Sequence, residues 1–407
     1  MGAGLLAAVA LTCLAAAPAV DERAPVPPVK TGWDVAGIPL VNFTTDRGMG
    51  YGLYAAVFDH GEEGAGSNPY RTSVGGQFYQ TSGGYAYHKL MIDMFDAFGT
   101  DMRLDMRGGY ESWDSAWYFG QGNQTPRLEV DDTPENYYSS EVQSFWWISN
   151  ARLPLRGSID LFGGLTIRSA EVGIYPGSRL DQERPTGHEG GRYHLATAGV
   201  ILDTRDTEPS TTRGVFSEIS IRGAHSWIGS EWALWGLNAT HRQWWRLDDH
   251  GDWVLALRLG LDGRFGGEAP FFHQHVLGGS QWVQIGGNMA LRGLPFGRIR
   301  GDLTSYGQLE LRWSAARFVW GARSLRMMVV SFADTARVFD ADEDDSLGHL
   351  RWSGGSGLRL VYNEVFVVRF DVAMGQEEYT SVADPLGTDV VRRDSVLGIY
   401  AMVGHPF

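Results

Sequence analysis

The 407-residue sequence has little cysteine, no long hydrophobic run and no excess of basic charge. Its single cysteine, Cys13, lies in the first 19 residues, so the remainder of the chain contains no thiol, which suits an oxidising compartment. The net charge of −14 argues against nucleic-acid binding, because neutralising phosphates requires a basic face. The apolar run near the N-terminus is shorter than the ~20 residues that a membrane-spanning helix needs.

Motifs for catalysis or metal binding are equally scarce. No G-x-S-x-G sequence occurs, so no nucleophile elbow of a hydrolase can be assigned. His273-Gln274-His275 has a suggestive spacing, but no nearby Cys or Glu completes a metal-binding set, and a polar loop explains the pair better. We therefore expect no enzyme activity, no metal and no cofactor, with a barrel-embedded hydrolase as the least favoured alternative.

The N-terminal segment has the character of an export signal. Residues 4–19 are small or apolar and end in Ala17-Pro18-Ala19, which fits an h-region followed by an A-x-A cleavage site. We expect residues 1–19 to be a cleaved signal peptide and residues 20–32 a Pro-rich periplasmic tether. Residues 33–407 then form one domain.

The whole chain is rich in glycine (54 residues) and in aromatic side chains (12%), and apolar and polar residues alternate along residues 33–407. Residues 253–265 illustrate the alternation, which is typical of a strand with one apolar and one polar face. One face carries Trp253, Leu255, Leu257, Leu259, Leu261 and Phe265, and the other carries Arg258, Asp262 and Arg264. Residues 159–169 repeat the pattern.

Two architectures contain such strands: a soluble sandwich and a membrane barrel. The predicted strands are long enough for a tilted membrane crossing, and their polar faces carry charges of both signs, as a wet lumen requires. Aromatic pairs such as Trp146-Trp147 are interpreted as strand-end girdles. We therefore predict an all-β fold, a 16-stranded antiparallel transmembrane β-barrel in the bacterial outer membrane.

The predicted strands are joined by connections of two kinds. Short turns such as 248–252 alternate with long connections such as 114–135 and 266–302, which is the pattern of outer-membrane barrels. The sixteen strands are predicted to begin near Asp34, Gly50, Arg71, Tyr85, Asp101, Tyr137, Gly157, Arg192, Val215, Glu231, Trp253, Thr304, Leu325, His349, Glu364 and Asp394.

The chain ends in Phe407 on an alternating segment. A terminal aromatic residue resembles the signal by which the bacterial barrel assembly machinery recognises its substrates. We expect that machinery to be a partner during biogenesis, and outer-membrane lipid and lipopolysaccharide to surround the finished barrel.

The sequence Leu291-Arg292-Gly293-Leu294, within the long connection 266–302, resembles a motif of the bacterial surface antigen superfamily, which includes BamA, TamA and the two-partner secretion transporters. In that family the motif lies on a loop that folds back into the barrel lumen. The resemblance therefore implies an inward-folded loop in this chain. The usual aromatic residue at the last position is replaced by Leu294.

Further segments match the family in order. Residues 308–312, which include Glu310, and residues 332–338, which include Asp334, resemble its next two strands. The resemblance is clearest over residues 190–407. A turn motif of the family is matched by Asp203, Arg205, Asp206, Pro209 and Gly214.

The alternation itself predicts where the loop arginine binds. Leu309, Leu311 and Trp313 are expected to face outward, which turns Glu310 toward the lumen. Asp334 is an acid in an otherwise apolar run. An inward-pointing Arg292 could then be held by both carboxylates through charge-assisted hydrogen bonds, and Gly293 would let the backbone approach the wall.

The resemblance implies a role in outer-membrane assembly or protein translocation, with a periplasmic or outer-membrane protein partner that the sequence does not identify. The space before residue 33 holds only a tether, so we expect a barrel-only member without POTRA domains. A gated or passive diffusion channel for small solutes is the alternative.

Overall fold

A computed structural model describes residues 31–61, 70–128, 133–208, 210–320, 323–339, 349–362, 366–380 and 392–403. The predicted signal peptide, nearly all of the predicted tether, Pro209 and the C-terminal Phe407 lie outside the described residues.

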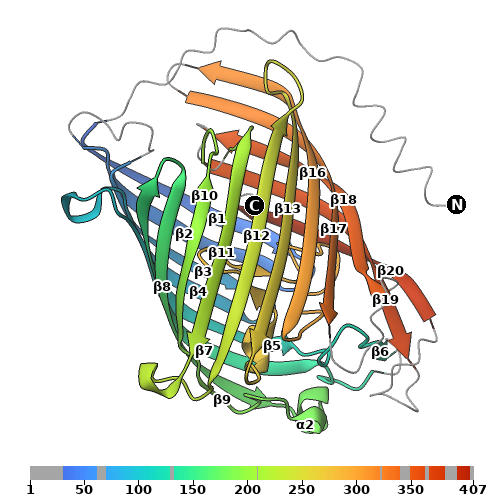
Figure 1. Ribbon diagram of the computed structural model, residues 1–407. Coiled ribbons are helices and arrows are strands. Elements are labelled where there is room, and N and C mark those ends of the chain that lie inside the picture. Colours follow the sequence, from blue (N-terminus) through green and yellow to red (C-terminus); the bar gives the residue numbers. More distant parts are fainter. Residues whose placement is uncertain are drawn as a thin grey trace, which may run out of the picture.

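Sixteen long strands of the described chain form a closed antiparallel barrel, which confirms the predicted fold (Figure 1). Each strand begins within three residues of its predicted start. The strands are β1 (Trp33–Thr44), β2 (Gly48–Asp59), β3 (Thr72–Thr81), β4 (Tyr85–Met94), β5 (Arg103–Trp117), β7 (Ser139–Arg156), β8 (Ile159–Ile174), β10 (Leu195–Asp203), β11 (Gly214–Ala224), β12 (Leu234–Arg246), β13 (Trp253–Phe265), β16 (Leu303–Trp320), β17 (Arg323–Phe339), β18 (Arg351–Tyr362), β19 (Phe366–Thr380) and β20 (Arg392–Val403).

Short elements occupy the connections between these strands. No helix of the described residues is long and apolar enough to cross a membrane. The short elements are η1 (Ala97–Gly99), β6 (Arg127–Leu128), α2 (Arg179–Glu183), β9 (Gly190–Arg192), η3 (Ser226–Ile228), α3 (Phe271–Gln274), β14 (Val276–Leu277) and β15 (Val283–Gln284). The rim that carries β6, α2 and β9, at the bottom of Figure 1, is called the long-loop rim below.

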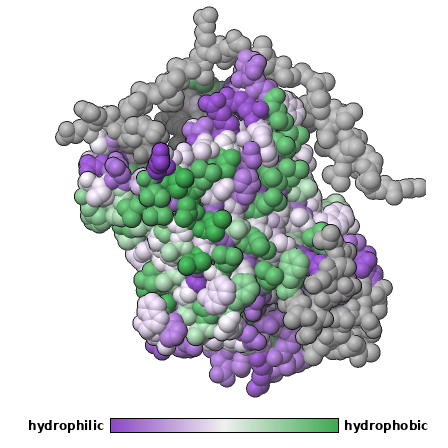
Figure 2. All heavy atoms as spheres, viewed as in Figure 1, coloured by the Kyte–Doolittle hydropathy of each residue, from purple (hydrophilic) through white to green (hydrophobic). Residues whose placement is uncertain are grey.

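The two faces of the wall differ as the alternation predicts. On β13, Leu259 and Leu261 are nearly half exposed on the outside, whereas Arg258 and Asp262 are fully buried inside. Figure 2 shows hydrophobic residues over the middle of the drawn face and hydrophilic residues toward its two ends. An apolar outer band with polar ends is the surface that a bilayer covers.

The strand-end interpretation of Trp146-Trp147 was wrong. Both residues lie in the middle of the 18-residue strand β7. The Trp146 ring is buried on the luminal side, where it stacks on Tyr87 with ring centroids 5.6 Å apart. Local sequence could not reveal this, because the position of a ring along the barrel axis depends on the stagger between neighbouring strands.

The barrel closes between its first and last strands. Among the described residues this seam contains only two residue pairs, Phe43 with Ala401 and Thr44 with Tyr400. The other fifteen contacts between neighbouring barrel strands contain between seven (β3 with β4) and seventeen (β16 with β17). Residues 33–42 of β1 have no ladder pair with the described residues of β20, although the Asn42 side chain contacts Met402. The seam is therefore the weakest ladder of the described wall.

Candidate functional site

The long connection from β13 to β16, residues 266–302, folds into the lumen and is called the plug below (Figure 1). The short hairpin of β14 and β15 forms part of it. Its apolar side chains pack against the inner faces of β16 and β17, at Tyr306, Ala336 and Val338. The plug residues in this packed cluster are Leu277, Val283, Ile285, Ala290, Leu291, Leu294 and Ile299.

Arg292 joins the plug to the wall. Its Nε donates to Oδ2 of Asp334 at 2.8 Å, and its Nη2 donates to Oδ1 of the same carboxylate at 2.8 Å. Its Nη1 donates to Oε1 of Glu310 at 2.7 Å, and its guanidinium carbon lies 3.5 Å from the centroid of the Phe332 ring. All three charged side chains are fully buried. Their mutual hydrogen bonds therefore replace the hydrogen bonds to water that each group loses on burial.

Further charges surround this contact. Arg312 donates to Glu310 at 2.9 Å, and Arg369 lies 3.3 Å from Asp371, which also pairs with Arg359. Burial lowers the pKa of Arg292, but the carboxylates of Asp334, Glu310 and Asp371 outweigh burial and hold that pKa above its usual value. Arg292 is therefore a permanent charge. We call this group the luminal ion-pair cluster: Arg292, Glu310, Arg312, Asp334, Arg359, Arg369 and Asp371.

The glycine and leucines of the motif fit close to the wall. Gly293 has a φ of +98°, and a Cβ there would lie 3.0 Å from backbone atoms of Gly375 and Met374. Its N–H donates to the hydroxyl of Tyr400 on β20 at 3.1 Å. Leu294 is fully buried beside Gly375. The motif therefore contacts the last two strands as well as β16 and β17.

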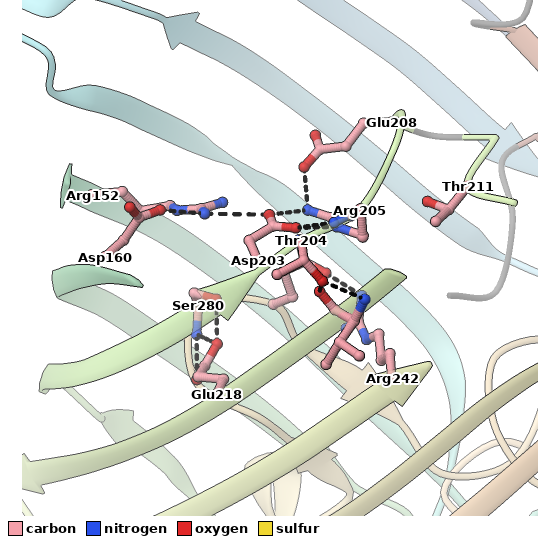
Figure 3. Close-up of polar contacts among 12 residues, drawn as sticks. Arg152, Asp160, Asp203, Thr204, Arg205, Glu208, Thr211, Glu218, Arg242 and Ser280 are labelled. Carbon is pink, nitrogen blue, oxygen red and sulfur yellow. Dashed lines mark hydrogen bonds and ion pairs between the residues drawn. The ribbon is translucent and has the colours of Figure 1, made fainter. Parts of the chain in front are cut away.

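A second set of contacts holds the β14–β15 end of the plug. The Ser280 N–H donates to Glu218 of β11 at 3.1 Å, and the Gly278 N–H donates to Asp262 of β13 at 2.9 Å (Figure 3 shows the first contact). Arg264 donates to the carbonyl oxygen of Val276 at 2.6 Å. Buried backbone groups of the plug are thus paired with side chains of the wall.

Residues 118–128, which follow β5, form a second inward loop that the sequence analysis did not predict. The N–H of Gly122 donates to the carbonyl oxygen of Arg300 at 2.7 Å. Arg298 donates to the carbonyl oxygen of Thr125 at 2.6 Å and pairs with Glu377 of β19 at 2.6 Å. The glycine-rich run 118–123 was a visible signal, but its partners are distant in the sequence, such as Gln274 for Gln121 and Arg300 for Gly122, and leave no local pattern.

The turn motif of Asp203, Arg205, Asp206 and Gly214 lies between β10 and β11, at the rim opposite the long-loop rim. Arg205 forms a two-point contact with Asp203, which also receives a hydrogen bond from Arg152 of β7 at 3.3 Å (Figure 3). Asp206 accepts hydrogen bonds from the N–H groups of Thr207 and Thr212, both at 3.0 Å. Gly214 has a φ of +110°. These contacts stabilise a tight turn far from the plug motif.

The two plug histidines are buried. Burial lowers the pKa of His275 well below its usual value, and the nearby Arg300 lowers it further. The Nδ1 atom of His275 lies 3.1 Å from Nη1 of Arg300, so the neutral ring accepts a hydrogen bond from the guanidinium. In the described part of the chain, no group of three His, Cys, Asp or Glu side chains is placed to hold a metal ion. The hydrogen bond between Arg300 and His275 joins two parts of the plug.

Residues 68–383 match the model of the Omp85 superfamily domain. The chain belongs to the Omp85 superfamily. This Omp85 barrel is similar to BamA from Haemophilus ducreyi lacking POTRA domains 1–3, with a TM-score of 0.57 and 14% identity over 92% of this chain and 70% of that one. It is also similar to CdiB from Escherichia coli, with a TM-score of 0.51 and 12% identity over 92% of this chain and 63% of CdiB.

A search of curated proteins found no match to this Omp85 barrel. The chain spans less than two thirds of the length of CdiB. At 12–14% identity the likeness to both solved structures concerns the fold. The family resemblance drawn from the ordered motifs is confirmed by the superfamily match.

Proposed function

We propose that this Omp85 barrel acts in the outer membrane as a component of protein assembly or translocation, with its wall opening at the seam between β1 and β20. The observation that carries the proposal is the seam, which has two residue pairs among the described residues, in a wall whose other strand contacts have seven or more. Strand pairing is the main cohesion between barrel strands, so the barrel should separate where the fewest pairs must break.

The plug supports the same proposal. Arg292, which is paired with β16 and β17, and Gly293, which is bonded to Tyr400 of β20, place one loop across the strands near the seam. A loop that folds into the lumen and contacts β20 favours a gated wall over a permanently open pore. A channel for small solutes is the weaker candidate, because the plug lies in the lumen and packs against its wall at β16 and β17.

A disulfide across the seam tests the proposal. Phe43→Cys with Ala401→Cys would join the two strands at a paired position, and Leu257→Cys with Leu309→Cys would join β13 to β16 as the matched control. We expect the seam disulfide to reduce assembly of other outer-membrane proteins in the host, with recovery on reduction, and the control disulfide to have no effect.

Depletion of the protein gives an independent measurement. Lower levels of other outer-membrane proteins, or of a secreted polypeptide, would support the proposed role. An unchanged outer-membrane proteome, together with a large steady conductance of the intact protein in planar bilayers, would contradict it and favour the channel.

A further inference from the structure

A cavity of about 500 Å³ lies between the plug and the part of the wall formed by β1, β3–β5, β7, β8, β19 and β20. We call it the seam cavity, because it touches both β1 and β20. Its volume falls within the range of small-ligand sites, roughly 300–1,000 Å³. Neither the plug contacts nor the proposed gating of the seam requires it.

The charge of the seam cavity is opposite to that of the protein. The whole chain carries a net charge of −14. Among the described residues, the cavity is nevertheless lined by five basic side chains and two acidic ones. The basic residues are Arg47, Lys89, Arg107, Arg168 and Arg369, and the acidic residues are Asp46 and Glu111.

Several of these cations retain unused donors. Lys89 makes no hydrogen bond or ion pair with any described residue, and its ammonium lies 5.6 Å from the Tyr87 ring centroid. The Nε atoms of Arg47 and Arg107 are buried without a hydrogen-bond partner among the described residues, while Nη2 of Arg107 pairs with Asp105 at 3.3 Å. Buried donors without partners are costly, so an anionic ligand that accepts from them would be favoured.

Aromatic side chains form one wall of the cavity. The rings of Tyr85 and Tyr87 stack with centroids 6.1 Å apart, and Tyr87 stacks in turn on Trp146. Tyr79 contacts the Tyr85 ring edge-on at 6.3 Å. Tyr and Trp combine an apolar body with a polar tip, and they are enriched where lipid headgroups meet the acyl region.

The cavity also reaches the outer, apolar side of the barrel. Val41 of β1 and Val368 of β19 line it, although both point outward and are well exposed. Both valines lie near the stagger between β1 and β20. The seam cavity is therefore lined by inward-facing basic side chains and by outward-facing apolar ones. A ligand that satisfies both would have an anionic head and an apolar tail.

We propose that the seam cavity binds the phosphate-bearing headgroup of an anionic membrane lipid, whose acyl chains leave the barrel between β1 and β19–β20. Lys89 and Arg107 donate to the phosphate, the Tyr85–Tyr87–Trp146 stack contacts the glycerol region, and Val41 and Val368 contact the chains. This activity goes beyond the proposed function, because lipid binding requires no polypeptide substrate.

The test uses the full-length protein purified in detergent, with lipid retention measured by native mass spectrometry. Phosphatidylglycerol is compared with phosphatidylcholine, and water-soluble glycerol phosphate serves as the headgroup without chains. We expect retention of phosphatidylglycerol well above that of phosphatidylcholine. Equal binding of glycerol phosphate and phosphatidylglycerol would overturn the assignment to a lipid, because acyl chains would then add nothing.

Two variants locate the site. Lys89→Gln with Arg107→Gln should weaken phosphatidylglycerol binding about tenfold or more, since each cation near an anionic headgroup contributes favourably. Arg156→Gln with Arg213→Gln removes the same charge at exposed positions outside the cavity and should leave binding unchanged. Heat-modifiable gel mobility checks that both variants fold. Unchanged binding in the folded Lys89/Arg107 variant would overturn the proposal, whatever the outcome of the seam disulfide.

Discussion

Arg292 and Asp334 form a two-point ion pair, with both nitrogen–oxygen distances at 2.8 Å, inside the lumen of a membrane barrel. The backbone N–H of Arg292 donates to the same carboxylate at 3.0 Å. Three hydrogen bonds therefore fix both the side chain and the main chain of one plug residue on strand β17. Because both groups are fully buried, neither can exchange its partner for water.

Arg292→Met should release the plug. Removing one partner of a buried ion pair leaves the other charge unpaired, which costs about 3–5 kcal/mol. We expect larger and more frequent conductance events in planar bilayers and a lower temperature for the heat-modifiable gel shift. Adding Asp334→Asn to the variant should recover part of the stability, because the orphaned charge is gone. A double variant no more stable than Arg292→Met alone would argue against direct coupling.

Gly293→Ala tests the close approach of the plug to β19. The substitution adds left-handed strain of about 1 kcal/mol and also forces a Cβ to within 3.0 Å of the backbone of Gly375. Gly177→Ala is the matched control, because Gly177 also has a positive φ (+77°) but nothing within 4 Å of the added Cβ. We expect the Gly293 variant to lower the unfolding temperature clearly more than the control. Equal effects would mean that only the backbone conformation matters.

Glu377→Gln should loosen the second inward loop. Arg298 would lose its charged partner on β19 while keeping its hydrogen bonds to Thr125. We expect faster hydrogen exchange in residues 118–128 with little change in the strands remote from that loop. Glu171→Gln, at an exposed position on β8, is a control that removes a similar charge. Unchanged exchange in residues 118–128 would show that the ion pair does not order this loop.

Asp46 predicts a pH dependence of the contact between the β1–β2 turn and the plug. Burial raises the pKa of Asp46 to about 6, although Arg47 and a backbone hydrogen bond from Phe296 oppose the rise. An acid with a raised folded-state pKa favours folding most when protonated. Its contribution should therefore be full below its unfolded pKa of ~3.9 and should be lost as the pH rises to about 6.

The unfolding temperature measured between pH 4 and pH 8 checks this expectation. Asp46→Asn should remove the part of the pH dependence that lies between pH 4 and pH 6. Asp96→Asn, in the connection between β4 and β5, provides a control for the loss of a carboxylate. An identical pH profile in the wild type and in Asp46→Asn would contradict the assignment.

Much of the wall could be predicted because strand faces depend on local alternation. The pattern over residues 309–313 predicted that Leu309 and Leu311 face outward and that Glu310 faces inward, and their exposures agree. The same alternation did not predict the height of Trp146 along the barrel axis, which is the middle of β7 and not a strand end. The inward fold of residues 118–128 was not predicted, because Arg298 and Arg300, which contact this loop, belong to the plug.

The strands, their order along the chain and the face on which each side chain lies could be predicted from the sequence alone. Successive side chains of a strand point to opposite faces, so neighbouring residues carry this information. Three features emerged only from the tertiary structure: β1 and β20 close the described wall with two residue pairs, Gly293 of the plug bonds to Tyr400 of β20, and basic side chains gather around the seam cavity. These features depend on barrel closure and stagger, which join residues hundreds of positions apart and leave no trace in local pattern.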